Sequence, residues 1–545
     1  MRLKDLLKIE KGIAYAVSFF LFIPFSYKFY EPFVDIKRGL SFPLILILGI
    51  LFFLFKKKVR VSKSYIILSS FTLILSLSII WSANRSLTFF SITRYMFFLI
   101  VLLVFQNSHS LKRTFFKGVF ISACLLGVYV FFQAFKIDPF HLGARVATIG
   151  NSNYLGVILL FFTSFFFYEF VNTKKKFDLI LFIFFSIALV FGARMRSAVL
   201  AFFAGLTIFS FYRKNKIFIS VMIIVMVIGV VIISGELMKG KASFWIRYYI
   251  GRDSIKGVLS SFKTAVFGFG ENSYLDSFNK FRSVDAFRVG GKNIYSITSH
   301  NIFIDVFFEL GLVGLAVFVY YLIFLFNSSE KKQRLILLTF LIVSSFLNPL
   351  KHISTSILFF IPLIMLKRGR KVEVSKNIFI FIIILLAIAS LFMECTRLKN
   401  SFYAMKYFQN KQTTGELTEY DSGLYLFEKA NYFRRKKDYK KAEVSYLKCL
   451  KKLPEFVPAL LNTGQLYYNM KKDGKALKYY EKVIGINPEH PDAWFFKGAI
   501  KYNNMQYKES VRSLEKAYLL SGKKDKQALE LLLKIKRRTD DILDK

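Results

Sequence analysis

Cysteine is scarce in this sequence, and the three that occur do not form a site. Cys124, Cys395 and Cys449 lie far apart, without the short spacings of a metal-binding motif. Three scattered residues in a chain of 545 also cannot build a disulfide framework. A cysteine-ligated metal centre and a disulfide-stabilised domain are therefore not expected.

Nucleotide-binding motifs are missing as well. The chain contains no Walker A run and no glycine-rich turn between a strand and a helix, so an ATP-driven pump is not favoured. It also lacks two halves of matched hydropathy with interrupted helices, a pattern that many secondary transporters show. Neither class of transport protein is predicted.

Acidic residues are few. The chain has 35 Asp and Glu and 78 Lys and Arg, which gives a formal net charge of +43. Such an excess is common in nucleic-acid-binding proteins. Here, however, the basic residues lie largely in short loops between apolar runs. We therefore predict a membrane protein with no nucleic-acid partner.

The sequence is rich in long apolar runs. Hydrophobic residues make up 54% of the chain, and 66 residues are Phe. A bilayer core of about 30 Å needs about 20 mostly apolar residues per helix. We predict an all-α fold, namely a polytopic transmembrane bundle of about 12 to 13 helices with a helical repeat domain at its C-terminal end. The candidate runs lie near 13–30, 41–55, 64–81, 88–105, 114–135, 153–171, 177–192, 197–212, 217–235, 301–326, 333–348, 353–366 and 377–394.

The basic clusters predict the orientation of these runs. With a cytoplasmic N-terminus, the positive-inside rule is satisfied, because the clusters within 56–63, 112–113, 174–176, 213–216, 331–334 and 367–376 all fall on the cytoplasmic side. No small-residue cleavage site follows the first run, so we interpret it as a retained helix. The segment 236–300 and everything after the last run are then external, which in a bacterial inner membrane means periplasmic.

The C-terminal part repeats with a period of 34 residues. This lag aligns Ala430 with Gly464 and Gly498, and Pro454 with Pro488. Helix-turn-helix units of this length, with small residues where two helices touch, are the tetratricopeptide pattern. We predict a tetratricopeptide-type α-solenoid over 423–545, after a linker at 396–422. Its concave face is expected to bind a peptide or protein, and the alternative is a rigid spacer.

Polar residues collect on the predicted outer face, where cations run against the positive-inside bias. His300 lies near the membrane surface, and Glu309 lies about two helical turns deeper. A carboxylate facing lipid at that depth costs about 2 to 4 kcal/mol. We therefore expect Glu309 to pair inside the protein, and Gly311 and Gly314 to permit close helix approach. The set comprises Arg145, Asn151, Asn153, Arg194, Arg196, Arg247, Arg252, His300, Asn301 and Glu309.

These residues resemble a known family, the O-antigen ligases with the related O-oligosaccharyltransferases and Wzy-type polymerases. The resemblance covers about 60–370. Met195 departs from the family, which usually has Ser there, so Arg194 and Arg196 remain alternatives. The matching elements are His300 and Asn301 followed by Glu309, Gly311 and Gly314; ARMRSA with Arg194 and Arg196; GNSN at 150–153; and Arg252 followed by Gly268 and Gly270.

The resemblance implies a glycan transferase domain over 1–395, with 236–300 as a large periplasmic loop that closes over the site. Such an enzyme moves a glycan from undecaprenyl pyrophosphate to an acceptor hydroxyl and inverts the anomeric centre, with no ATP, metal or other cofactor. His300 is implied as the proton acceptor. Arg194, Arg196 and Arg252 are implied to bind the pyrophosphate, with Asn153, Asn301 and Glu309 in support.

Several alternatives remain open. In the non-catalytic interpretation, His300 is an interfacial histidine without a role in the reaction, and the arginines contact lipid headgroups. The acceptor is lipid A core, a protein hydroxyl or another glycan, and the appended repeat favours the first two. Membrane lipid is an expected partner in every case. A non-enzymatic polysaccharide export or assembly scaffold is the rival class.

Overall fold

The computed structural model describes most of the chain. The described residues are 3–23, 35–55, 58–82, 85–137, 152–193, 195–213, 241–290, 296, 298–351, 353–365, 371–375, 377, 423–523 and 525–543. The predicted run 217–235, most of the run 377–394, and the linker 396–422 lie outside these ranges.

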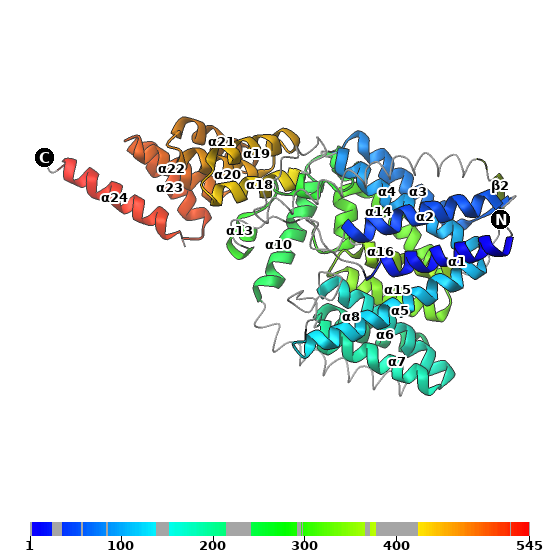
Figure 1. Ribbon diagram of the computed structural model, residues 1–545. Helices are drawn as coiled ribbons and strands as arrows, with labels where there is room; N and C mark the ends of the chain where they lie inside the picture. Colours follow the sequence, from blue (N-terminus) through cyan, green and yellow to red (C-terminus); the bar gives the residue numbers. More distant parts are fainter. Residues whose placement is uncertain are drawn as a thin grey trace.

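The described chain is almost entirely helical, as the apolar runs and the repeat predict. Figure 1 shows one bundle formed by helices from the N-terminal and central parts of the chain. Its elements are α1 (Leu3–Phe20), α2 (Asp35–Phe55), β1 (Lys58–Ser62), α3 (Lys63–Leu77), η1 (Ser78–Ile80), α4 (Arg85–Asn107), α5 (His109–Ala134), α6 (Ser152–Thr173), α7 (Lys176–Ile187), η3 (Ala188–Ala193), α8 (Arg196–Arg213), α14 (Ile302–Ser328), α15 (Lys331–Ser344), η5 (Pro349–Lys351), α16 (Ile353–Met365) and β2 (Lys371–Ser375).

A second group of helices lies beyond one end of this bundle (Figure 1). The connecting segment, residues 241–290, carries α10 (Lys241–Val258), α11 (Phe262–Phe267), α12 (Tyr274–Phe278) and α13 (Val284–Gly290). The repeat domain, residues 423–543, carries α18 (Gly423–Arg435), α19 (Tyr439–Lys452), α20 (Val457–Asn469), α21 (Asp473–Ile486), α22 (Pro491–Asn503), α23 (Tyr507–Leu520) and α24 (Lys526–Leu543). We call the end of the bundle that meets these helices the repeat-side end.

The predicted apolar runs that fall on described residues coincide with helices of the bundle. Only four described helical segments, however, are long and apolar enough to cross a membrane: Lys63–Ile80, His109–Ala134, Asn153–Thr173 and Ile302–Ser328. The transmembrane count of 12 to 13 is therefore not confirmed. Helix α1 also begins about ten residues before its predicted run, because lysines end an apolar run but are good helix formers.

One short sheet departs from the all-helical prediction. Strands β1 and β2 pair antiparallel, with Arg60 opposite Glu373. β-Branched valines alternate with polar residues in both KVRVS and KVEVS, which is a strand pattern rather than a helix pattern. The pairing places the described parts of two predicted cytoplasmic basic stretches, residues 58–62 and 371–375, at the same end of the bundle.

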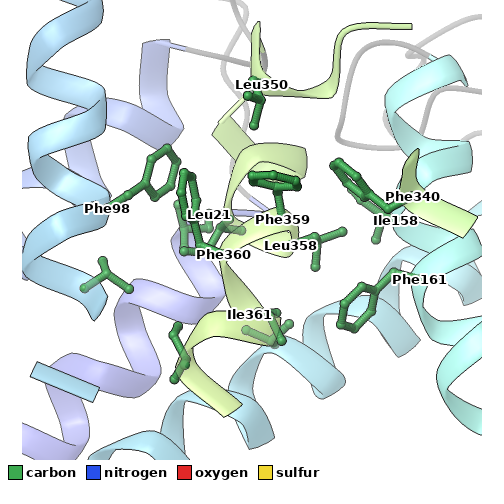
Figure 2. Packing of buried hydrophobic residues seen from close by; sticks show 14 of the residues in the cluster. Leu21, Phe98, Ile158, Phe161, Phe340, Leu350, Leu358, Phe359, Phe360 and Ile361 are labelled. Atoms are coloured by element: carbon green, nitrogen blue, oxygen red, sulfur yellow. The ribbon is translucent and has the colours of Figure 1, made fainter. Parts of the chain in front are cut away.

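The bundle core is built around α16. From Ile357 onward this helix is apolar on all sides, so burial on all sides is the stable arrangement. Phe360 stacks on Phe98 of α4 with ring centroids 4.4 Å apart, and Phe359 packs on Phe340 of α15 at 5.2 Å. Figure 2 shows both rings between the neighbouring helices.

Candidate functional site

The predicted site residues His300 and Asn301 lie at the start of α14. The Asn301 side chain caps the helix, because its Oδ1 accepts hydrogen bonds from the backbone N–H groups of Phe303 (2.9 Å) and Ile304 (3.2 Å). Its Nδ2 donates to the carbonyl of Ser345 at 3.2 Å. Asn301 therefore starts the helix and ties it to the end of α15, whereas its supporting role in a transferase site stays a prediction.

His300 sits in a strained turn immediately before this cap. Its φ is +63°, a left-handed conformation that costs a non-glycine residue about 1 to 3 kcal/mol. Surrounding bonds hold the turn: the His300 N–H donates to Thr298 Oγ1 at 3.0 Å, and the Ser299 N–H donates to Asp305 Oδ1 at 2.6 Å. The imidazole has no hydrogen-bond partner within the described ranges, which leaves its nitrogens available.

The protonation of His300 is set by its surroundings. Burial, together with the nearby positive charge of Arg247, lowers the pKa of His300 from 6.5 to about 4. The imidazole is therefore neutral near pH 7 and able to accept a proton. A bound anion beside both residues would offset the Arg247 charge and raise the pKa of His300 again.

Arg247 and Arg252 lie on the same helix, α10, but differ in their partners. Arg252 donates to Asp253 (3.1 Å), Asp285 (3.3 Å) and Ser283 (2.6 Å), which ties α10 to α13. Although burial lowers the pKa of Arg252, the bonds to both carboxylates raise it above the usual value. Arg247 has no carboxylate within ion-pair distance in the part of the chain that the structure describes, and burial lowers its pKa. The unpaired cation beside His300 is thus Arg247, whereas the phosphate-binding role of Arg252 stays a prediction.

Glu309 has the internal partner that the sequence predicts. Its carboxylate accepts from Lys351 Nζ at 2.7 and 2.9 Å. Glu309 is 3% and Lys351 12% exposed, so water contributes little to solvating either charge. Breaking a buried pair of this kind costs about 3 to 5 kcal/mol, because one charge is left uncompensated.

Further buried charges surround this pair and form what we call the polar cluster, namely Arg94, Glu271, Asp305, Glu309 and Lys351. Arg94 lies 3.6 Å from Glu271, which also accepts from Ser91 Oγ at 2.6 Å. Asp305 accepts from Asn348 Nδ2 at 2.7 Å. Sequence reasoning missed Asp305 and Glu271, although Asp305 precedes Glu309 by one helical turn and so shares its face.

A kink in α14 brings Glu271 to this cluster. Gly311 has φ +65° and ψ −162°, which interrupts the helix and frees the carbonyls of Phe308 and Glu309. These accept from the N–H groups of Phe269 (3.0 Å) and Gly270 (2.8 Å). A Cβ on Gly311 would lie 2.3 Å from the Val266 carbonyl oxygen at the end of α11, so only glycine admits this approach.

This geometry confirms the predicted role of one α14 glycine and corrects that of the other. Gly311 does permit a close helix approach, because its nearest neighbours are backbone atoms of Val266 and Phe267 at the end of α11. A Cβ on Gly314 would meet the side chain of Leu310 in its own helix. The backbone of Gly268 and Gly270 also docks onto the kink.

The other predicted site residues are described less fully. Arg194 lies outside the described residues; Arg196 begins α8, but its side chain is outside them as well. Asn153 lies in the first turn of α6. Its neighbour Tyr154 lies within Coulombic reach of Asp305 and Lys351, so this turn is close to the polar cluster. Among the described residues, no group of three or more His, Cys, Asp or Glu is arranged to hold a metal ion.

The repeat domain docks against the connecting segment through the loops between its units. The buried Asn487 side chain donates to the carbonyls of Asn279 (3.1 Å) and Arg282 (2.9 Å). Arg288 donates to the carbonyls of Leu519 and Leu520 at the end of α23. These contacts fix the repeat domain to the same segment that carries Arg247 and Arg252.

The repeat units pack as the 34-residue lag predicts. Positive φ recurs at Lys437, Lys471 and Met505, which marks the turn inside each unit. A Cβ on Gly464 would lie 2.8 Å from the Tyr480 ring, so the small residue sits where the paired helices touch. A pocket of about 430 Å³ lies between α20, α22 and α24, lined by Gln465, Phe495, Phe496, Gln527, Glu530 and Leu531.

Comparisons with known proteins concern the repeats. Residues 457–490, which span α20 and α21, match the tetratricopeptide repeat family. No curated protein matches the chain. The C-terminal domain is thus a tetratricopeptide-type repeat, and these comparisons identify no family for the bundle.

Two solved structures are similar to part of the chain. The first TPR of Spaghetti bound to an HSP90 peptide is 22% identical and covers 22% of this chain and 94% of that one, with a TM-score of 0.21. The Sgt2 TPR domain from Aspergillus fumigatus is 22% identical and covers 23% of this chain and 82% of that one, with a TM-score of 0.22.

Proposed function

We propose that the chain is a membrane glycosyltransferase that moves a glycan from undecaprenyl pyrophosphate to an acceptor hydroxyl, in the manner of the O-antigen ligases it resembles. The observation that carries the proposal is a strained, neutral His300 beside the unpaired Arg247, at the head of a kinked helix. Strain and an unpaired, half-buried cation both cost stability, and such costs concentrate at functional sites.

In this proposal, the arginines bind the pyrophosphate and stabilise the charge that develops as it leaves. Arg247 joins Arg194, Arg196 and Arg252 as a candidate. The bond from the anomeric carbon to the pyrophosphate oxygen breaks, and its electron pair stays on the pyrophosphate. The acceptor oxygen bonds to the opposite face of that carbon, while its proton passes to His300. The transferred bond supplies the energy, so ATP is not consumed.

The proposal includes a bundle of 12 to 13 membrane-spanning helices in a bacterial inner membrane, with the N-terminus cytoplasmic and the repeat domain periplasmic. The pairing of β1 with β2 supports it, because it joins two predicted cytoplasmic stretches at one end of the bundle. The acceptor is lipid A core or a protein hydroxyl. Chain extension of a glycan, as in a Wzy-type polymerase, is the variant that the large repeat domain favours less.

We further propose that the repeat domain holds a peptide or protein partner. The pocket between α20, α22 and α24 supports this, because it combines two phenylalanines with the side-chain amides of Gln465 and Gln527. Such a surface suits an extended peptide with alternating apolar and polar groups. This partner is also what a non-enzymatic assembly scaffold would need, so activity must decide between the two classes.

The deciding experiment mixes the purified protein with undecaprenyl-pyrophosphate-linked glycan and each acceptor, without ATP. The wild type is compared with His300→Ala and with His109→Ala, which alters an exposed histidine at the start of α5. We expect His300→Ala to lower the transfer rate about 10²- to 10⁴-fold, and His109→Ala to leave it unchanged. Absence of transfer by the wild type to any acceptor, while the repeat domain still captures envelope proteins, would favour the scaffold.

A further inference from the structure

The connecting segment exposes an apolar face that the proposed reaction does not use. Trp245, Tyr248 and Ile255 of α10 are exposed, and Leu259 and Phe262 continue the face, at 62% and 85% exposure. The first three are spaced as i, i+3 and i+10, which places them on one side of a helix. We call these five residues the aromatic stripe.

The opposite side of α10 packs against other helices. Ile250 and Val258 are buried against Tyr274, Phe278 and Phe308, which belong to α12 and to the head of α14. Helix α10 therefore has one face packed on α12 and α14 and one exposed face. Figure 1 shows α10 running steeply across the direction of α1 and α2, at the repeat-side end of the bundle.

The aromatic stripe lies beside a surface that itself has the character of a membrane span. Helix α3 belongs to the candidate span Lys63–Ile80, and its exposed residues Leu73, Leu77 and Ile80 form an apolar strip. Just beyond that strip, Trp81 donates from Nε1 to the Phe267 carbonyl at 3.1 Å, and their rings lie 5.6 Å apart. Trp81 and Phe267 thus join the end of the α3 strip to α11, whose first residue, Phe262, belongs to the aromatic stripe.

The composition of the segment fits one kind of partner. Tryptophan and tyrosine concentrate at the boundary between lipid tails and headgroups, where an apolar ring and a polar edge are both solvated. The exposed lysines Lys256 and Lys263 flank Leu259 and Phe262, where they can meet anionic headgroups. A helix with an aromatic and aliphatic face and lysines at its rim is typical of one that lies in the membrane plane.

We propose that the aromatic stripe of α10 and α11 is inserted into the lipid leaflet at the repeat-side end of the bundle. This interfacial anchor holds Arg247, which lies between Trp245 and Tyr248, at the depth of lipid headgroup phosphates. It also sets the distance of the repeat domain from the membrane. Helix α10 is tied through Arg252 and Asp285 to α13, and α13 contacts the repeat domain through Arg288. The inference does not depend on transferase activity.

Spin-label accessibility in the full chain, reconstituted in phospholipid nanodiscs, tests the proposal. The native cysteines are first replaced (Cys124→Ser, Cys395→Ser and Cys449→Ala). A nitroxide is then attached to Phe262→Cys, to Leu73→Cys as the lipid reference, or to Met505→Cys, an exposed residue in a repeat turn, as the water reference. Collisions with oxygen, which enters lipid, are compared with collisions with a water-soluble nickel chelate.

We expect the label at position 262 to resemble the label at position 73, with more relaxation by oxygen than by nickel. Nickel accessibility like that at position 505 would overturn the proposal, because the stripe would then face water. Protection from both reagents would also overturn it, because a protein partner or a second copy would then cover the stripe. If position 73 itself faces water, the membrane-spanning interpretation of α3 fails as well, so the two failures are distinguishable.

Discussion

Lys351 lies 2.7 Å from Glu309, and both side chains are almost completely withdrawn from solvent. Glu309 belongs to the first part of α14, and Lys351 is the last residue of η5. Their ion pair therefore joins η5 to α14. Along α14, Asp305 lies between the turn that holds His300 and the paired Glu309. The turn and the buried charges therefore depend on the same short stretch of α14.

Removing one member of this pair should destabilise the protein. We expect Glu309→Gln or Lys351→Met alone to cost about 3 to 5 kcal/mol, because each leaves a buried charge without its partner. The double substitution should cost less than the sum of the two single ones. Thermal unfolding of the detergent-solubilised protein measures this, and strictly additive effects would show that the two charges are not coupled.

The kink in α14 should be intolerant of any side chain. Gly311→Ala places a Cβ 2.3 Å from the Val266 carbonyl oxygen at a positive φ, so the end of α11 and the Gly268–Gly270 loop that follows it must move away. We expect faster hydrogen exchange at the Phe269 and Gly270 amides and a lower melting temperature. The matched control is Gly485→Ala in α21, where nothing lies within 4 Å of the added Cβ. That change should be neutral or slightly stabilising, because alanine favours a helix.

The protonation of His300 can be followed by its reaction with diethyl pyrocarbonate, which attacks the neutral imidazole. The pKa of His300 is lowered to about 4, so its neutral form persists as the pH falls from 7 to 5. An unperturbed histidine, with a pKa near 6.5, loses most of its reactivity over that range. Mass spectrometry of the modified peptide gives the rate at each pH.

Arg247→Gln removes one of the two causes of this low pKa, so the loss of reactivity should begin at a higher pH. Lys256→Gln, an exposed residue of the same helix, serves as the control and should leave the profile unchanged. A wild-type midpoint near 6.5 would contradict the burial of His300 beside Arg247.

The docking of the repeat domain should depend on Asn487. Asn487→Ala leaves the carbonyls of Asn279 and Arg282 without their donor, and a buried unsatisfied group costs about 1 to 3 kcal/mol. We expect faster hydrogen exchange over 279–288, with exchange in α16 unchanged. Asn503→Ala removes only an exposed bond to Tyr468 and should change neither region. Unchanged exchange over 279–288 in Asn487→Ala would show that other contacts suffice for docking.

The proposed orientation predicts opposite sides for the two ends of the chain. A C-terminal alkaline phosphatase fusion, active only after export, should be active in a bacterial host. A fusion that replaces the chain after residue 113, which follows a predicted cytoplasmic cluster, should be inactive. The reverse pattern would invert the topology and place the repeat domain in the cytoplasm.

Local chemistry was predictable where a residue acts on its own neighbours. Asn301 before an apolar helix is a capping residue, and the structure shows it capping α14. The 34-residue lag aligns the small residue Gly464 with its counterparts, and in the packed unit it meets the ring of Tyr480. The two-stranded sheet was missed because each strand is only five residues long, and its partner lies more than 300 residues away.

The sequence by itself determined the helices, the repeat and the need for an internal partner of Glu309, because helix length, periodicity and the cost of burying a charge are properties of a short stretch of chain. Only the tertiary structure decided that this partner is Lys351, that Gly311 admits the end of α11, and that Arg247 of α10 is unpaired among the described residues while Arg252 is held by carboxylates. Charge pairing depends on distances in space, and those distances are fixed when α10, α13 and α14 pack together.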